Sequence, residues 1–264
     1  MRTVLLNEGR EKVSAWNQKW KALKGLAKSR WLSRKYAGRQ KIQIGMMDKK
    51  ELRRIVAKRK KEYPDGELTQ MSRAVTERLR GLEAYRAAET VFAYMDLPGE
   101  VKMREFIRLA WAEGKTVAVP KICPVKAYET DFEQPVREGT SMEMRFFRID
   151  SFDDLREGMM HIMEPDPEKC VCLDHEEKAL IIMPGVAFDE DLHRAGYGGG
   201  FYDRYLAAHP HHPTVAAAYE FQIFEEAPAE PQDILPQLLV TEDRIIGPGS
   251  EERPPAGGTE AVYR

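Results

Sequence analysis

Hydrophobic residues recur at helical spacing in several parts of the chain. From residue 49 onward, Leu52, Ile55 and Val56 share one face while Lys and Arg cover the rest, which predicts an amphipathic helix. Residues 68–79 repeat the pattern. Between these two helices, Pro64-Asp65-Gly66 is typical of a turn. Two more helices are predicted, one around residues 106–111 that ends at Gly114 and one at 201–208.

Short apolar or β-rich runs lie between the helical segments. Their composition and their Pro and Gly boundaries predict strands at residues 90–95, 116–119, 145–149, 180–183, 215–219 and 238–241. The unbroken apolar character of residues 180–183 is typical of a strand buried on both faces. Ser151, followed by Asp153 and Asp154, resembles the start of a helix.

Strands that alternate with helices predict an α/β fold, a single doubly wound and mostly parallel sheet flanked by helices in the Rossmann-like manner. We assign residues 47–246 to this domain, 1–46 to a basic N-terminal extension and 247–264 to a disordered tail. Ligands of such sheets bind beyond the carboxyl ends of the strands. The site is therefore expected near residues 96–100 and from residue 184 onward.

Charge is distributed very unevenly. The chain as a whole has a formal net charge of −2, but residues 1–62 hold 20 Lys and Arg against 5 Asp and Glu. A basic segment of this kind suggests nucleic-acid binding, whereas a solvated helical arm is the simpler explanation. The pair Met46-Met47, directly before the first clear helix, raises a third interpretation, an upstream over-read of the natural start. We expect no nucleic-acid partner.

Three cysteines, two of them separated by one residue, do not form a disulfide framework. This usage indicates a reducing compartment, and we expect a cytoplasmic protein. The longest apolar run is far shorter than the ~20 residues of a membrane span, so no membrane partner is expected either. Since no strong apolar stripe is left over, we expect a monomer.

Four glycines within five residues, Gly196 and Gly198 to Gly200, form the most informative segment. Such a backbone can turn its N–H groups toward one point, and the helix that follows adds its positive dipole end, so a phosphate is the natural ligand. Neither the dinucleotide-binding pattern nor the P-loop pattern fits these residues. A flexible surface loop is the alternative, but Arg194, Tyr197 and Asp203 around the glycines favour a site. A carboxylate beside bound phosphate suits a hard divalent cation.

These residues also carry a resemblance. The stretch MPGVAFDEDLHRAGYGGGFYDRYL, residues 183–206, resembles the signature region of the 5-formyltetrahydrofolate cyclo-ligase family. Further matches follow in the family's order: KKELR at 49–53, AYMDLPGEV at 93–101, IMEP at 162–165, PQD at 231–233 and VTE at 240–242. The resemblance spans residues 48 to 245, and its glycine-rich string is specific.

The resemblance implies an ATP- and Mg²⁺-dependent enzyme. ATP would phosphorylate the formyl oxygen of 5-formyltetrahydrofolate, and ring closure would give 5,10-methenyltetrahydrofolate, ADP and phosphate. Tyr197, Gly198, Gly199 and Gly200 would hold the transferring phosphate. The residues implied to contact ATP are Lys49, Lys50, Arg53, Arg194, Gly196, Gly198, Gly200 and Tyr202. Met95, Glu100, Tyr197 and Phe201 would contact folate, and Asp203 and Asp233 would hold Mg²⁺.

The chain departs from the family pattern at His161, Gln232 and Gln237, none of which is assigned to phosphate or metal. Two alternatives to the enzyme therefore stay open. One is a non-catalytic paralogue that binds folate or nucleotide, although such a binder need not retain Asp203 and Asp233. The other is a nucleic-acid-associated protein that uses the basic extension, which predicts strongly salt-dependent binding.

Overall fold

The computed structural model describes residues 48–125, 141–158, 162–174, 176 and 178–248. The predicted N-terminal extension, the tail beyond residue 248 and His161 therefore lie outside the described residues. None of the helices within the described part is both long and apolar enough to cross a membrane.

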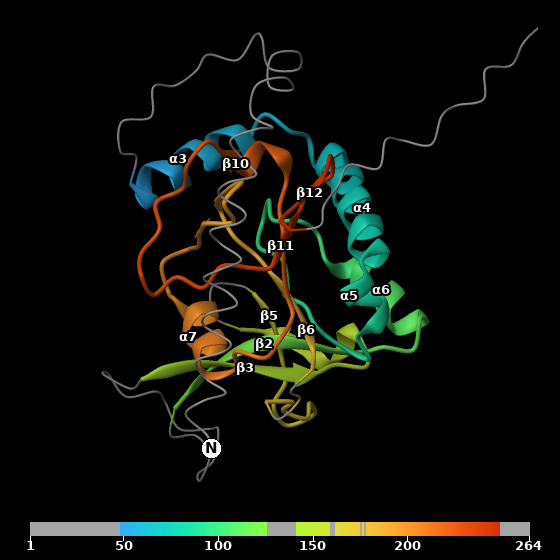
Figure 1. Ribbon diagram of the computed structural model, residues 1–264. Coiled ribbons are helices and arrows are strands. Elements are labelled where there is room, and N and C mark those ends of the chain that lie inside the picture. The colour runs from blue at the N-terminus through green and yellow to red at the C-terminus, as the bar shows by residue number, and fades with distance from the viewer. Residues whose placement is uncertain (1–47, 126–140, 159–161, 175, 177, 249–264) are drawn as a thin grey trace, which may run out of the picture. The chain divides into compact units, whose positions relative to one another are not determined.

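Seven strands form the central sheet in the order β12-β11-β9-β6-β1-β2-β3 (Figure 1). The five inner strands are mutually parallel, and the edge strands β3 and β12 are antiparallel to their neighbours. This confirms the predicted mostly parallel sheet. The strands are β1 Thr90–Phe92, β2 Thr116–Pro124, β3 Met142–Arg148, β6 Leu180–Met183, β9 Thr214–Ala217, β11 Leu238–Val240 and β12 Ile245–Ile246.

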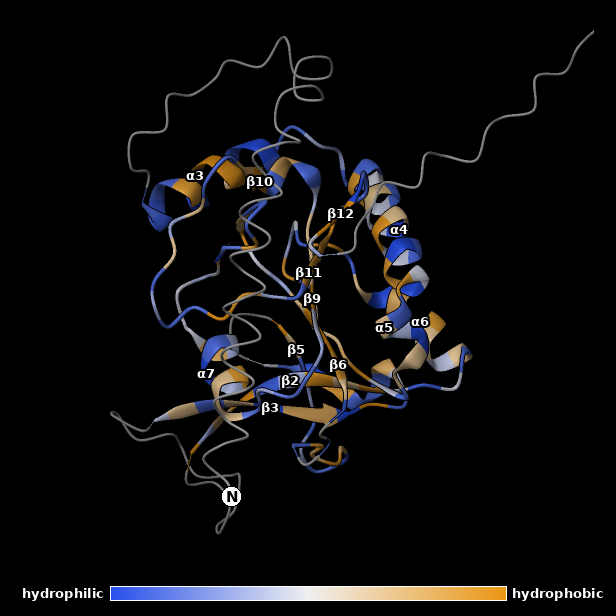
Figure 2. Cartoon of the chain, viewed as in Figure 1, coloured by the Kyte–Doolittle hydropathy of each residue, from blue (hydrophilic) through white to orange (hydrophobic). Residues whose placement is uncertain are grey.

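Helices cover both faces of this sheet. In β6, Leu180 and Ile182 point into one apolar cluster, and Ile181 and Met183 point into another. The first cluster is covered by α3 (Lys49–Lys60), α4 (Asp65–Gly81), α5 (Glu83–Ala87) and α6 (Arg104–Ala112), and the second by α7 (Phe201–Ala208) (Figure 1). Figure 2 shows both hydrophilic and hydrophobic residues along α4, as expected of a helix with one buried face.

The expected ligand site lies at the carboxyl ends of β1 and β6, because the chain continues from these two strands to opposite sides of the sheet. From β1 the chain passes through α6 to β2 on one side, whereas from β6 it passes through α7 to β9 and on to β11 on the other. Because β1 and β6 are neighbours and parallel, their carboxyl ends open into the same crevice. The segments after these two strands are residues 93–103 and 184–200.

The remaining elements are short. A small sheet has the order β10-β7-β8, and β4 pairs with β5 in a two-stranded ribbon. Their bounds, with the two 3₁₀ turns, are η1 Phe152–Asp154, β4 Leu155–Glu157, β5 Met163–Pro165, β7 Ala187–Asp189, β8 Arg194–Ala195, η3 Glu220–Gln222 and β10 Ile223–Phe224. The helix expected at Ser151 is the single turn η1, with Ser151 as its cap.

The predicted turn at Pro64-Asp65-Gly66 is wrong in detail. Helix α4 begins at Asp65, with Pro64 as its N-cap, and the chain reverses over residues 61–63 instead. The reason is that Asp65 and Glu67, in the first turn of α4, complement the positive end of the helix dipole. A glycine such as Gly66 is tolerated in this first turn. Turn residues and helix-start residues are the same types, so composition alone does not separate them.

Candidate active site

The glycine-rich loop connects β8 to α7 with its backbone open to solvent. Gly198 has φ 103° and Gly200, the N-cap of α7, has φ 61°, both in the left-handed region that glycine adopts without strain. No backbone N–H from Gly196 to Gly200 donates a hydrogen bond to another described residue. Exposed N–H groups at the start of a helix suit an anion, as the sequence predicts.

Gly200→Ala is therefore expected to lower the free energy of unfolding by about 1 kcal/mol, because a side chain at a left-handed position is strained. Its Cβ would also lie 3.1 Å from Nη1 of Arg204. Urea unfolding gives the measurement. The control is Gly66→Ala in α4, where nothing lies within 4 Å of the new Cβ and alanine suits a helix better. Equal stability changes in both variants would show that the loop carries no conformational requirement.

Helix α3 brings basic residues to the loop and to residues 230–233. Arg53 donates from Nε to the carbonyl of Gly196 at 2.8 Å. Lys49 Nζ lies 2.8 Å from Asp233 Oδ2 and 2.9 Å from Glu230 Oε1. Burial lowers the pKa of Lys49, but these two acidic partners outweigh it and raise that pKa above its ordinary value. Lys50 is exposed, and the structure does not bring it to the other predicted site residues.

Arg194 and Asp203 form the buried part of the site. Arg194 Nη2 donates to Asp203 Oδ1 at 2.9 Å, and the same carboxylate oxygen accepts the backbone N–H of Ile234 at 3.0 Å. Asp203 therefore lies beside the segment that carries Asp233. Nε of Arg194 and the hydroxyl of Tyr202 are both buried without a hydrogen-bond partner in the described residues. Unpartnered buried polar atoms are costly, so two of them at this place suggest a missing ligand.

Glu100 faces the loop from the opposite strand end. Its side chain is only 5% exposed, and Oε2 accepts the backbone N–H of Leu97 at 2.8 Å. Burial raises the pKa of Glu100 to about 7, although hydrogen bonds from Leu97 and from the hydroxyl of Tyr197 oppose the shift. Tyr197 remains 54% exposed, and its hydrogen bond to Glu100 joins the glycine-rich loop to the segment after β1.

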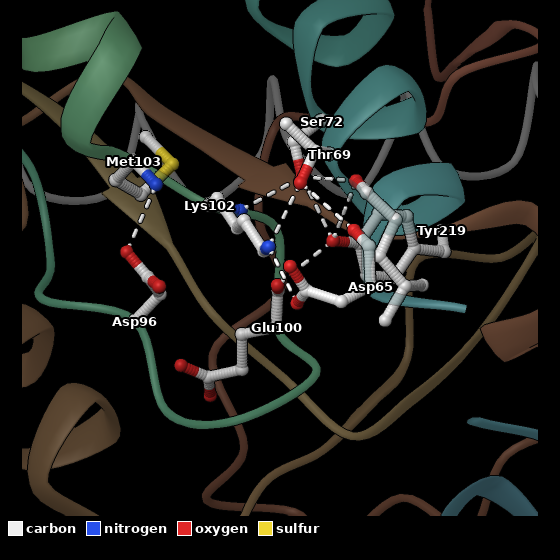
Figure 3. Close-up of polar contacts among 9 residues, drawn as sticks. Asp65, Thr69, Ser72, Asp96, Glu100, Lys102, Met103 and Tyr219 are labelled. Carbon is white, nitrogen blue, oxygen red and sulfur yellow. Dashed lines mark hydrogen bonds and ion pairs between the residues drawn. The ribbon is translucent and has the colours of Figure 1, made fainter. Parts of the chain in front are cut away.

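A polar network fixes the segment that carries Glu100 (Figure 3). The hydroxyl of Tyr219, which follows β9, donates to the carbonyl of Glu100 at 2.9 Å and contacts Ser72 Oγ of α4 at 2.8 Å. Ser72 Oγ in turn accepts the backbone N–H of Lys102 at 3.0 Å, and Asp96 accepts that of Met103 at 3.0 Å. The network places Glu100 rigidly. Sequence reasoning missed Tyr219, although its position directly after a parallel strand was a usable signal.

Asp189 holds the chain in place and does not face the glycine-rich loop with an open carboxylate. Its carboxylate is buried and accepts the N–H groups of Asp191 and His193 at 2.9 Å, His193 Nδ1 at 2.8 Å and the N–H of Ala227 at 2.9 Å. It therefore supports the turn before Arg194 and fixes the start of the segment that leads to Asp233.

The two predicted metal ligands are neighbours in space. Asp203 and Asp233 offer carboxylate oxygens, the donors that Mg²⁺ prefers. Both now neutralise cations, Arg194 and Lys49 respectively. Among the described residues no group of three or more metal-ligating side chains exists, so waters or ligand oxygens must complete the shell. Mg²⁺ usually retains such ligands, and two carboxylates beside an exposed phosphate nest therefore fit this ion.

The last two predicted folate residues differ in exposure. Met95 is buried in the main core cluster, and Phe201 is half-buried beside Gly199. The departures Gln232 and Gln237 are both exposed. Gln232 contacts Glu230, and Gln237 donates its backbone N–H to Thr214. Neither side chain hydrogen-bonds Asp203 or Asp233 within the described structure.

Comparisons with known proteins agree with this geometry. The model of the 5-formyltetrahydrofolate cyclo-ligase family matches residues 45–242. The 5-formyltetrahydrofolate cyclo-ligase of Escherichia coli K12 is 26% identical over 193 residues, which cover 72% of this chain and 98% of that protein. A mitochondrial enzyme of the same name from Arabidopsis thaliana is 33% identical over 130 residues, 42% of this chain and 47% of that one.

A solved structure agrees as well. The NMR structure of 5,10-methenyltetrahydrofolate synthetase from Aquifex aeolicus superimposes with a TM-score of 0.61 at 27% identity. The match covers 82% of this chain and all of that chain.

Proposed function

The chain belongs to the 5-formyltetrahydrofolate cyclo-ligase family, and from this premise we propose that it converts 5-formyltetrahydrofolate and ATP to 5,10-methenyltetrahydrofolate, ADP and phosphate. The observation that carries the proposal is the hydrogen bond between Tyr197 and Glu100. It brings the glycine-rich loop, whose N–H groups from Gly196 to Gly200 are open to an anion, to the buried carboxylate of Glu100 after β1.

In the proposed reaction the formyl oxygen attacks the γ-phosphoryl group of ATP, and N10 of the folate then attacks the activated formyl carbon as phosphate leaves. Phosphoryl transfer needs positioning and charge neutralisation more than covalent help. The exposed N–H groups of Gly198 to Gly200 would hold the transferring phosphoryl oxygens. Arg53, fixed on Gly196, and Arg194, with its free Nε, would neutralise the charge that develops there.

Asp203 and Asp233 are the residues that would hold Mg²⁺. When bound there, the ion would supply positive charge that offsets the negative charge of the transferring phosphate. ATP would offer Lys49, the first residue of α3, an anionic partner in addition to Asp233 and Glu230. We infer that Lys49 shifts from Asp233 toward ATP, which frees that carboxylate.

Glu100 would recognise the bicyclic ring of the folate. The 2-amino group and N3–H of that ring are hydrogen-bond donors, and an ionised carboxylate can accept both. The aromatic faces of Tyr197 and Phe201 lie on the loop side, where they would contact the ring. We further propose that the protein acts as a cytoplasmic monomer on these small molecules alone, without a nucleic-acid or membrane partner.

The test is a spectroscopic assay. Purified protein is mixed with 5-formyltetrahydrofolate, ATP and Mg²⁺, and the near-ultraviolet absorbance of the methenyl product is followed. Product that requires both ATP and Mg²⁺ is the expected result. Absence of product with folate still bound in calorimetry would favour the non-catalytic paralogue instead. Absence of both would mean that the glycine-rich loop serves another phosphorylated ligand.

Deletion of residues 1–46 is expected to leave kcat within about threefold, since every residue assigned to the site lies at or after Lys49 and a change below 1 kcal/mol indicates no lost catalytic contact. The measurement is steady-state kinetics of the shortened and full-length proteins side by side. Binding of RNA or DNA that depends strongly on salt and disappears with the deletion would instead support the nucleic-acid interpretation.

A further inference from the structure

The amide of Gln222 lies between the two segments that form the site. Gln222 is the last residue of η3 and is only 2% exposed. Its Nε2 donates to the carbonyls of Gly185 at 2.8 Å and Val186 at 2.9 Å, and its Oε1 accepts the backbone N–H of Tyr219 at 2.8 Å. Both N–H groups of the amide and its oxygen are therefore used by the protein itself.

On one side, this amide supports the segment that carries Glu100. The Tyr219 whose N–H reaches Gln222 also donates its hydroxyl to the carbonyl of Glu100 at 2.9 Å and contacts Ser72 Oγ at 2.8 Å (Figure 3). Because the backbone and the hydroxyl of Tyr219 are both held, its rigid ring transmits the position of Gln222 to Glu100.

On the other side, the amide supports the chain that leads into the glycine-rich loop. The N–H of Val186 donates to the carbonyl of Ala195 at 2.8 Å, directly before Gly196. Gly185 packs against Arg194, since a Cβ added at Gly185 would lie 3.1 Å from Cγ of Arg194. The two carbonyls held by Gln222 therefore belong to residues that support Arg194 and the start of the loop.

A continuous path of hydrogen bonds thus crosses the site from the folate side to the phosphate side. Its members, in order, are Glu100, Tyr219, Gln222, Val186 and Ala195. All of them are buried, so water does not compete for the links, and hydrogen bonds are electrostatically stronger in such surroundings. The path fixes the placement of one side of the site relative to the other.

We propose that Gln222 is a positioning residue for the reaction, because it sets the spacing between Glu100 and the glycine-rich loop. The inference rests on the proposed function, which places the folate ring at Glu100 and the transferring phosphate at the loop. The formyl oxygen must then meet the γ-phosphoryl group in one geometry. A misplacement of about 1 Å can lower a rate about a hundredfold. Gln222 therefore acts on kcat and leaves the binding of each substrate alone unchanged.

The first test compares Gln222→Met with Gln237→Met. Methionine has a similar length but cannot form the three hydrogen bonds of the amide. Gln222→Met should lower kcat about a hundredfold. The separate Kd values for 5-formyltetrahydrofolate and for a non-hydrolysable ATP analogue with Mg²⁺ should remain within about threefold of wild type, a change below 1 kcal/mol. Gln237 is exposed and bonds Thr214 only through its backbone N–H in the described structure, so Gln237→Met should retain full activity.

The concentration of folded protein is taken from binding of the ATP analogue, so that unfolded molecules do not lower the measured kcat. Unchanged kcat in Gln222→Met would overturn the proposal. So would a rise in both Kd values that accounts for the whole loss of activity, because a general loosening of the fold would then explain it.

Tyr219→Phe tests the next link of the path with a smaller change. It removes only the hydroxyl that reaches Glu100 and Ser72, and kcat should fall about tenfold, the effect of one buried hydrogen bond, with both Kd values unchanged. Since the two residues act through one path, the double variant should be no slower than Gln222→Met alone. Additive losses in the double variant would overturn the path, as would full activity of Tyr219→Phe, which also decides the case if Gln222→Met does not fold.

Amide hydrogen exchange of the protein without substrates separates this inference from the activity. In Gln222→Met, the amides of Val186 and of Leu97, which donates to Glu100, should both exchange about tenfold faster than in wild type. The amide of Ile149, which donates to Val117 of β2, should not change. If both amides lose protection while the wild type forms no product, the path stands and the proposed function fails. If the wild type forms product but the variant loses protection on neither side or on one side only, the proposed function stands and the positioning role of Gln222 fails.

Discussion

Asp203→Asn should reduce kcat about a thousandfold, which corresponds to roughly 4 kcal/mol of lost transition-state stabilisation. The substitution removes one of the two carboxylates assigned to Mg²⁺. It preserves a side-chain oxygen that can accept from Arg194 and from the N–H of Ile234, but it removes the charge that pairs with Arg194, so the fold is checked separately. Single-turnover kinetics at saturating ATP and folate, over a series of Mg²⁺ concentrations, give the measurement.

The control is Asp150→Asn, which removes an exposed carboxylate that pairs only with Arg148 in the described structure. It should retain full activity. Thermal unfolding of both variants within a few degrees of wild type would show that the fold is preserved. Titration with Mn²⁺ in the presence of a non-hydrolysable ATP analogue should show weaker metal binding in Asp203→Asn alone. Full activity of that variant at limiting Mg²⁺ would remove the metal assignment.

The sequence predicted best those elements whose residue types follow directly from their burial or from their capping residue. β6 at Leu180–Met183 and α7 at Phe201–Ala208 have the predicted bounds, because one is buried on both faces and the other follows a glycine cap. The ribbons β4-β5 and β10-β7-β8 were missed, since strands of two or three residues are too short for a period to be recognised. These short strands form because the larger fold already holds the segments that pair in them side by side.

The candidate site likewise has one part that the sequence predicted and one part that only the fold shows. Local motifs identified the glycine-rich loop, Arg194 and Asp203, which are close together in the sequence. The pairing of Tyr197 with Glu100, and of Lys49 with Asp233, depends on which strand ends lie side by side. Nothing in the local sequence distinguishes Gln222 from other polar residues near strand ends. Only its hydrogen bonds do so, and those contacts are a property of tertiary structure.

Glu100 should make substrate capture depend on pH. Its pKa is raised to about 7 by burial, so in the free protein the carboxyl group is protonated below that pH and ionised above it. Only the ionised form accepts both ring donors of the folate. We therefore expect kcat/KM to rise about tenfold per pH unit as pH increases toward 7, and to level off above it, because kcat/KM reports ionisations of the free enzyme.

Glu100→Gln should lower the plateau of kcat/KM about a hundredfold, since hydrogen bonds to a charged acceptor contribute about 1.5–3 kcal/mol each. It should also abolish the rise near pH 7, which a merely structural role would not predict. The matched control is Glu242→Gln. Burial also raises the pKa of Glu242 to about 7, but its carboxylate accepts the backbone N–H of Glu220 and was not assigned to folate. If the profile flattens in Glu242→Gln and persists in Glu100→Gln, the ionisation belongs to the other carboxylate, and Glu100 is not the group that reads the folate ring.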